Sequence, residues 1–144
     1  MDELQKAAKV AFASEFTFYL KAHFFHWNVE GPNFTQLHEL FGKIYGEVYD
    51  SIDDFAEKLR ALGAYAPGSN SRFNILSYID DEQQVLSADQ MIVELLEDSD
   101  NMVQVLKRVY DIAESAGEHG FSNFLAERMD AHRKHSWMLR ATAK

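Results

Sequence analysis

The chain has 144 residues, of which 47% are hydrophobic and 26% are charged, and its formal net charge is −9. This length and composition are typical of a single globular domain, here residues 1–144, and exclude a disordered chain. The sequence contains no cysteine, which excludes disulfides, iron–sulfur clusters and zinc sites with thiolate ligands. The acidic balance disfavours nucleic acid as a general partner and favours cations.

Membrane and export signals are not evident in the sequence. There is no apolar run of the ~18 residues that a membrane-spanning helix requires. The N-terminal sequence MDELQKAAKV is charged and lacks the apolar core of a signal peptide. We therefore expect a cytoplasmic protein with no membrane partner.

Apolar residues at helical spacing predict two long helices in the first half of the chain. The first covers residues 2–28 and is ended by Gly31-Pro32. The second follows Asn33, a suitable N-cap, and extends to about residue 62, where Gly63 is expected to be its C-cap. The short link between these helices predicts an antiparallel hairpin.

A long connection, residues 64–86, separates these helices from the second half of the chain. Within it, residues 72–79 are expected to form one short helix. Ser87 and Gln90 have the spacing of a capping box, which predicts the start of a third long helix that continues to about residue 116.

Gly117 and Gly120 are expected to break this helix, and a fourth helix is predicted over residues 121–142. No stretch alternates in polarity for long enough to predict a strand. The fold class is therefore all-α: a four-helix bundle with a long crossover between its second and third long helices that carries a short helix.

Two histidines and two carboxylates form a candidate metal site: His26, His38, Asp53 and Glu57. This mixed nitrogen and oxygen set suits a redox-active first-row metal such as iron. His38 and Asp53 lie on the same predicted helix, roughly 22 Å apart at ~1.5 Å per residue, so one coordination sphere cannot include both. Either these are two unrelated pairs, or a second copy of the chain lies antiparallel and supplies the missing half.

The spacing is compatible with two half-sites. His26 and His38 are equally far from Pro32, so a hairpin places the two imidazoles opposite each other. Asp53 and Glu57 are i,i+4 neighbours and share one helix face. The ordinary alternatives are hydrogen-bonded core histidines and a solvated acidic face.

The midpoint between His38 and Asp53 falls at Tyr45 and Gly46, which should lie near the axis of such a symmetric pair. Gly42 and Gly46 lie on the same stripe of the helix. Each glycine inside a helix costs ~1 kcal/mol relative to alanine. A close crossing of two helix backbones at the axis would offset that cost.

Other residues have subsidiary expected roles. The remaining histidines are expected at the surface or beside the site: His23, His119, His132 and His135. His132 and His135 have a spacing that could bind metal, but the basic neighbours Arg133 and Lys134 argue against it. Three aromatic residues are expected mainly to pack near the site, and they could also take up stray oxidising equivalents: Trp27, Tyr45 and Tyr49.

The segment HWNVEGPNF, residues 26–34, followed by Leu37-His38 and Phe41, resembles a motif of the Dps family, the mini-ferritins that protect DNA in starved cells. Asp53 with Ala56-Glu57-Lys58 resembles the family's Asp-x-x-Ala-Glu-Arg element, with lysine in place of arginine. Residues 63–68, 126–128 and 135–139 resemble further parts of the family pattern. The likeness therefore spans nearly the whole chain.

This resemblance implies a ferritin-like bundle assembled as a hollow shell of twelve subunits. It implies ferroxidase sites shared across two-fold interfaces, with His26 and His38 from one subunit and Asp53 and Glu57 from its mate. Such sites would oxidise Fe(II), preferably with hydrogen peroxide, or with O2. The Fe(III) product would be stored as mineral, and no organic cofactor is implied.

The sequence departs from the family pattern in three ways. Gly42 stands where many relatives carry an acidic residue, which predicts one firm iron position and one poor one. At the expected three-fold entry pore Glu118 keeps an acid, Asn123 replaces an expected aspartate, and Glu114 could substitute for it. No Lys-rich tail precedes the first helix, so DNA binding is expected to be weak or absent.

Two other functions are compatible with this reading. One is a DNA-binding protein that compacts and protects the nucleoid and has weak or no ferroxidase activity. The other is a structural shell that has lost its oxidation chemistry through Gly42.

Overall fold

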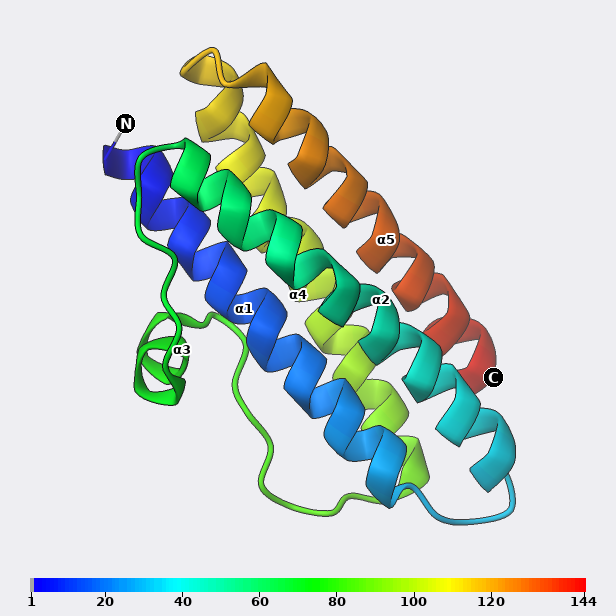
Figure 1. The fold of residues 1–144 in the computed structure, drawn as a ribbon. Helices are drawn as coiled ribbons and strands as arrows, with labels where there is room; N and C mark the ends of the chain where they lie inside the picture. Colours follow the sequence, from blue (N-terminus) through cyan, green and yellow to red (C-terminus); the bar gives the residue numbers. More distant parts are fainter. Residues whose placement is uncertain (1) are drawn as a thin grey trace.

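The computed structural model describes residues 2–144 as an all-helical chain (Figure 1). It contains the long helices α1 (Asp2–Asn28), α2 (Phe34–Ala61), α4 (Ala88–Ser115) and α5 (His119–Ala143), and the short helix α3 (Asn70–Leu76). No residue from 2 to 144 lies in a strand. The predicted four-helix bundle with a helix in its long crossover is therefore confirmed. None of the helices in this range has the length and apolar character needed to cross a membrane.

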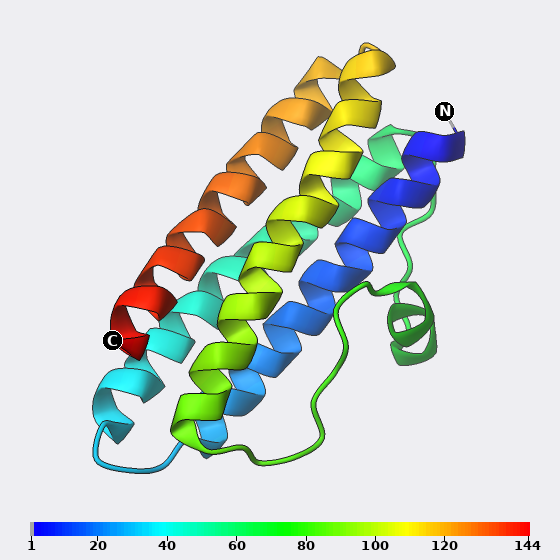
Figure 2. The ribbon, with the colours of Figure 1, turned by 180° about the vertical axis from the view of Figure 1, so that it is seen from behind.

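The bundle consists of two antiparallel hairpins, α1 with α2 and α4 with α5, packed against each other (Figures 1 and 2). The connection after α2 returns along the outside of the bundle and places α3 against α1. As a result, α2 and α4 begin at the same end of the molecule and run parallel, as the length of this connection predicts.

Several helix ends follow the predicted signals. Ser87 Oγ accepts a hydrogen bond from the Gln90 N–H, and the Gln90 side chain accepts one from the Ser87 N–H, so the predicted capping box is present. Gly63 and Gly117 have φ values of +87° and +75°, which favour glycine, and each lies just beyond a helix end.

Other ends differ from the prediction. Asn33 precedes α2, but its side chain makes no capping hydrogen bond. The short helix begins at Asn70 because Ser69 Oγ accepts a hydrogen bond from the Arg72 N–H, so it starts and ends earlier than predicted. Gly120 does not break a helix but lies inside α5, which begins at His119.

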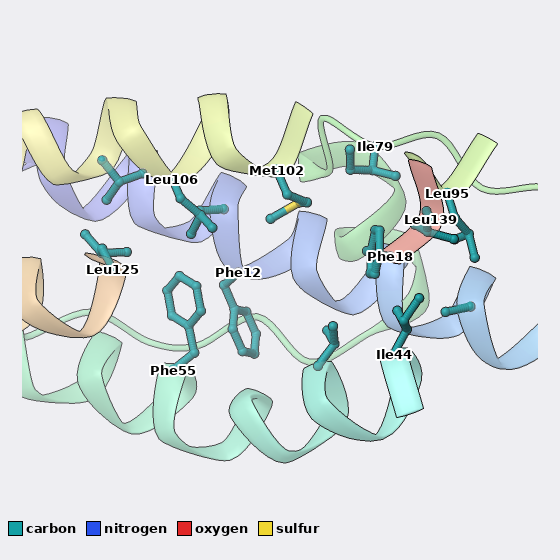
Figure 3. Close-up of a cluster of buried hydrophobic side chains, with 14 of the residues drawn as sticks. Phe12, Phe18, Ile44, Phe55, Ile79, Leu95, Met102, Leu106, Leu125 and Leu139 are labelled. Carbon is teal, nitrogen blue, oxygen red and sulfur yellow. The ribbon is translucent and has the colours of Figure 1, made fainter. Parts of the chain in front are cut away.

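Apolar side chains from every long helix meet along the axis of the bundle (Figure 3). The rings of Phe12 and Phe55 contact edge to face at 5.5 Å between centroids and join α1 to α2. Met102 and Leu106 of α4 and Leu125 of α5 are fully buried beside them. Each such side chain contributes about 1.5–3 kcal/mol through burial, so the core fixes the arrangement of the helices.

A charged network interrupts this apolar core. Arg128 of α5 donates from Nε to Glu15 of α1 at 2.8 Å and contacts Glu47 of α2 through both terminal nitrogens. His132 Nε2 lies 2.5 Å from Glu15 Oε1, and His135 Nε2 lies 2.9 Å from Glu47 Oε1. The expectation that His132 and His135 lie at the surface or beside the metal site is therefore wrong.

The cause of this error is the helical period of α5. Residues 128, 132 and 135 share one face, which points into the bundle, whereas the intervening Arg133 and Lys134 are exposed. Burial alone would raise the pKa of Glu15, but His132 and Arg128 outweigh it and hold this pKa at about 2. At Glu47, hydrogen bonds from His135 and Arg128 likewise outweigh burial and hold the pKa at about 2. Both glutamates are therefore negatively charged, and Arg128 donates hydrogen bonds to both.

Candidate metal centre

His26 and His38 face each other where α1 ends and α2 begins. Their rings stack at 3.8 Å between centroids, with an interplanar angle of 16°. His26 Nδ1 donates a hydrogen bond to the carbonyl oxygen of His38, and His38 Nδ1 donates one to the carbonyl oxygen of His26, each at 2.7 Å. The predicted juxtaposition of the two imidazoles is thus present in the structure.

These reciprocal hydrogen bonds define the tautomer of both rings. A carbonyl oxygen can only accept, so each Nδ1 must carry the proton. In the neutral imidazole, Nε2 then carries the lone pair that binds a metal ion. A histidine that donates its second ring N–H to a carbonyl is the usual arrangement for an oriented metal ligand. The two histidines are therefore suited in tautomer and orientation to bind Fe(II).

Gly42 has a structural role beside this pair. A Cβ atom at this position would lie 3.1 Å from His26 Nδ1 and 3.2 Å from its Cε1. The missing side chain therefore lets the His26 ring lie against α2. By contrast, a Cβ atom at Gly46 would meet nothing within 4 Å in this chain, so its neighbourhood is open to another molecule.

Asp53 and Glu57 lie near the opposite end of α2, and both side chains are exposed. The negative charge of Asp53 and a hydrogen bond between the two side chains raise the pKa of Glu57. A cation bound between the two carboxylates would neutralise their mutual repulsion, so that both could stay ionised. Their oxygen donors match the preference of Fe(III) for hard ligands.

The single chain does not complete a metal site. Within residues 2–144, no three histidine, aspartate, glutamate or cysteine side chains gather to hold one ion. The structure brings His26 together with His38 and Asp53 together with Glu57. The rise of α2 keeps the two pairs roughly 22 Å apart. Each pair on its own offers only two donor side chains.

Aromatic rings surround the histidine pair. Tyr45 lies 5.1 Å from the His26 ring and stacks on His23 at 3.8 Å, and His23 lies 4.0 Å from Trp27. Tyr49 contacts Tyr19 at 5.0 Å. Sequence reasoning placed Trp27, Tyr45 and Tyr49 near the site but overlooked Tyr19. Its signal was available, because residues 19, 23 and 27 are spaced at i, i+4 and i+8 on α1.

The three residues considered for an entry pore lie around the turn between α4 and α5. Glu114 accepts hydrogen bonds from Ser122 Oγ at 2.6 Å and His119 Nδ1 at 2.7 Å, and these bonds lower its pKa. Glu118 directly precedes α5 and is half-buried, and Asn123 is exposed. In this chain Glu114 stabilises the turn, and a role in a pore stays a prediction.

The fold and the paired donors define a class of protein. The chain matches the family model of the ferritin-like domain over residues 5–144. It is therefore a ferritin-like protein. Comparison with individual relatives shows to which ferritin-like family it belongs.

The protein "DNA protection during starvation protein 2" of Bacillus anthracis is 32% identical over 123 residues, which cover 85% of this chain and 84% of that protein. The corresponding protein of Brevibacillus brevis is 33% identical over 85% of this chain and 83% of its own length. The crystal structure of Dps from Staphylococcus aureus superposes with a TM-score of 0.95 at 29% identity, covering 100% of this chain and 97% of that one. The chain belongs to the Dps family, and this membership supports a role in iron storage or DNA protection.

Proposed function

We propose that this protein is a ferroxidase and iron-storage cage. It oxidises Fe(II) with hydrogen peroxide or O2 and retains the Fe(III) product as mineral. One observation supports the proposal: the oriented His26–His38 pair lies at one end of α2 and the Asp53–Glu57 pair lies near the other, so each end offers two of the four expected iron ligands. A chain with two incomplete halves requires a second copy.

An antiparallel partner across α2 supplies the missing half. A two-fold axis near Tyr45 and Gly46 would bring the histidines of one subunit to the carboxylates of the other, twice per dimer. The open space at Gly46 and the exposure of Tyr49 (56%) and Trp27 (58%) leave this face free to be covered. Family membership favours assembly of such dimers into a dodecamer.

The chemistry follows from the donors. The neutral imidazoles offer Nε2 lone pairs to Fe(II), and the two Nδ1–H bonds keep both rings oriented as the substrate enters. The carboxylates of the partner subunit would favour the more highly charged Fe(III) product. Oxidation by peroxide removes both reagents that generate hydroxyl radicals, so the reaction would protect the cell against oxidative stress.

The experiment that tests this proposal is complementation between two inactive variants. His38→Ala and Asp53→Ala should each abolish rapid Fe(II) oxidation by stoichiometric peroxide. A mixture that is dissociated and reassembled should regain activity, because a mixed dimer contains one intact site. Glu39→Ala and Asp54→Ala are the matched controls, since both residues are exposed neighbours on α2.

Particle size and helicity must be measured in every sample to verify assembly. Full activity of His38→Ala alone would exclude the assigned ligands. Inactive variants that reassemble with each other but recover nothing would exclude a site shared between subunits.

A further inference from the structure

A tyrosine–histidine pair lies beside the candidate iron ligands and is not needed to bind iron. Tyr19 Oη lies 3.0 Å from His23 Nδ1. The His23 ring stacks on Tyr45 at 3.8 Å with an interplanar angle of 8°, and Tyr45 lies 5.1 Å from the His26 ring. A continuous set of rings therefore connects a candidate iron ligand to a hydrogen-bonded phenol.

The protonation states of this pair suit transfer of a proton from Tyr19 to His23. Burial, with the neighbouring Tyr49 and Tyr45, raises the pKa of Tyr19, so its phenol keeps the proton at neutral pH. Burial, with the nearby His26, lowers the pKa of His23, so its imidazole is neutral and can accept. In the tautomer of His23 that carries its proton on Nε2, the phenol O–H donates to Nδ1. Loss of an electron makes a phenol strongly acidic, and His23 is in position to take the proton.

The proposed reaction needs one more electron than a single Fe(II) supplies, and the Tyr19–His23 pair is placed to provide it. Reduction of hydrogen peroxide takes two electrons, and one Fe(II) supplies one. Gly42 offers no donor for a second iron, and the His26 ring lies against it. A site loaded with a single Fe(II) therefore supplies only one of the two electrons that peroxide needs. Without another electron donor, this one-electron reduction releases a hydroxyl radical.

We propose that Tyr19, hydrogen-bonded to His23, supplies the second electron when a single Fe(II) reduces hydrogen peroxide. This inference rests on the proposed ferroxidase function. The O–O bond breaks, one electron comes from Fe(II) and one from Tyr19, and the phenol proton moves to His23 Nδ1. The products are Fe(III), two hydroxide ions, a neutral tyrosyl radical and a protonated His23, so atoms and charge balance.

The geometry gives the electron a short route. The Tyr19 and Tyr45 ring centroids are 6.1 Å apart, and Tyr45 is the ring that faces His26. Within residues 2–144, no histidine nitrogen lies at hydrogen-bond distance from the Tyr45 hydroxyl, whereas Tyr19 has His23 Nδ1 at 3.0 Å. We therefore expect the radical to form on Tyr19 rather than on Tyr45.

The test compares Tyr19→Phe with wild type at one Fe(II) per site and stoichiometric peroxide. Phenylalanine keeps the ring that packs against Phe16 but removes the hydroxyl. Rapid-freeze electron paramagnetic resonance measures the tyrosyl radical, a spin trap measures escaping hydroxyl radical, and absorbance measures the initial rate of Fe(II) oxidation. Tyr110→Phe is the matched control, because Tyr110 is a half-buried tyrosine on α4.

Wild type and Tyr110→Phe should show the radical. Tyr19→Phe should lose it, release several-fold more trapped hydroxyl radical and keep its initial oxidation rate. His23→Phe, which retains a ring for stacking on Tyr45, should also lower the radical yield several-fold although Tyr19 is intact. A large excess of Fe(II) should remove these differences, because a further Fe(II) then supplies the second electron.

Rapid Fe(II) oxidation by wild type with no tyrosyl radical, or with equal radical in Tyr19→Phe, would overturn the inference and leave the ferroxidase proposal intact. No Fe(II) oxidation above the rate in buffer would overturn both. The initial rate therefore distinguishes the two failures.

Discussion

The absence of a side chain at Gly42 of α2 leaves room for the ring of His26, a candidate iron ligand. A glycine inside a helix costs about 1 kcal/mol relative to alanine. Here the space of the missing side chain is filled by the His26 ring, which is held by a 2.7 Å hydrogen bond to His38 and by stacking at 3.8 Å. Any side chain at this position must displace a ring that cannot move freely.

We predict that Gly42→Ala weakens Fe(II) binding several-fold without unfolding the protein. The new Cβ atom would lie 3.1 Å from His26 Nδ1, so the ring must shift by a few tenths of an ångström and its hydrogen bond must lengthen. Helix propensity would offset part of this cost by ~1 kcal/mol. Anaerobic calorimetric titration with Fe(II) measures the affinity.

Gly46→Ala is the matched control for this variant, because it gives the same gain in helix propensity and meets nothing within 4 Å in the chain. Wild-type affinity in Gly42→Ala would show that the position of the His26 ring does not matter. Dissociation of the particle by Gly46→Ala would instead indicate that the backbone of a second subunit lies close to this position.

At the scale of the helices, Arg128 joins three elements of the bundle. It contacts Glu15 of α1 and Glu47 of α2 from its place on α5, and it is 4% exposed. Removal of one partner from a buried ion network leaves an uncompensated charge. Such changes cost about 3–5 kcal/mol.

We therefore predict that Arg128→Ala lowers the free energy of unfolding by about 3–5 kcal/mol, as expected for a broken buried ion pair. Urea denaturation followed by circular dichroism measures the change. Arg133→Ala is the control, since Arg133 lies on the exposed face of the same helix and should change stability little. Equal effects of the two variants would contradict the role assigned to Arg128.

The same network predicts how stability depends on pH. The pKa of Glu15 is about 2 in the folded protein and 4.5 ordinarily, so the folded state binds its proton less readily than the unfolded state does. Its contribution is fully present above pH 4.5 and is lost as the pH falls towards 2. One pKa unit corresponds to ~1.4 kcal/mol, which makes this contribution roughly 3 kcal/mol.

Urea midpoints measured between neutral pH and pH 3 test this prediction when wild type is compared with Glu15→Gln. The difference in stability between the two proteins should shrink as the pH falls, because the wild-type carboxyl approaches the neutral state of the amide. A difference that stays constant over this range would show that Glu15 is not the group responsible.

The elements were largely predictable from sequence because their signals are local. The apolar stripes of α1 and α2 and the capping box at Ser87 are set by neighbouring residues, and the structure confirms them. The His26–His38 pair was predictable because both residues lie equally far from Pro32. The burial of His132 and His135 was not, since their acidic partners Glu15 and Glu47 are distant in sequence and only the packed bundle brings them together.

At the scale of the whole molecule, residues 2–144 of a single chain do not gather a complete metal site. Its two pairs of candidate ligands lie at separate positions along α2, and apolar side chains such as Trp27 and Tyr49 are exposed. The sequence could indicate this incompleteness, because helix geometry alone separates His38 from Asp53. It could not define the interface, which depends on how the surfaces of two folded subunits fit.

The net charge of the molecule argues against strong DNA binding. Relatives of this chain are named for DNA protection, but its net charge is −9, and affinity for DNA depends mainly on basic residues that neutralise phosphates. We predict that the assembled protein does not retard plasmid DNA in a gel at physiological ionic strength. Any retardation at low salt should disappear in the double variant Lys6→Ala, Lys9→Ala, which removes the exposed or half-exposed basic residues near the start of α1. Strong retardation by the wild-type protein at physiological ionic strength would contradict this prediction. It would also show that this acidic surface concentrates its lysines and arginines where DNA binds.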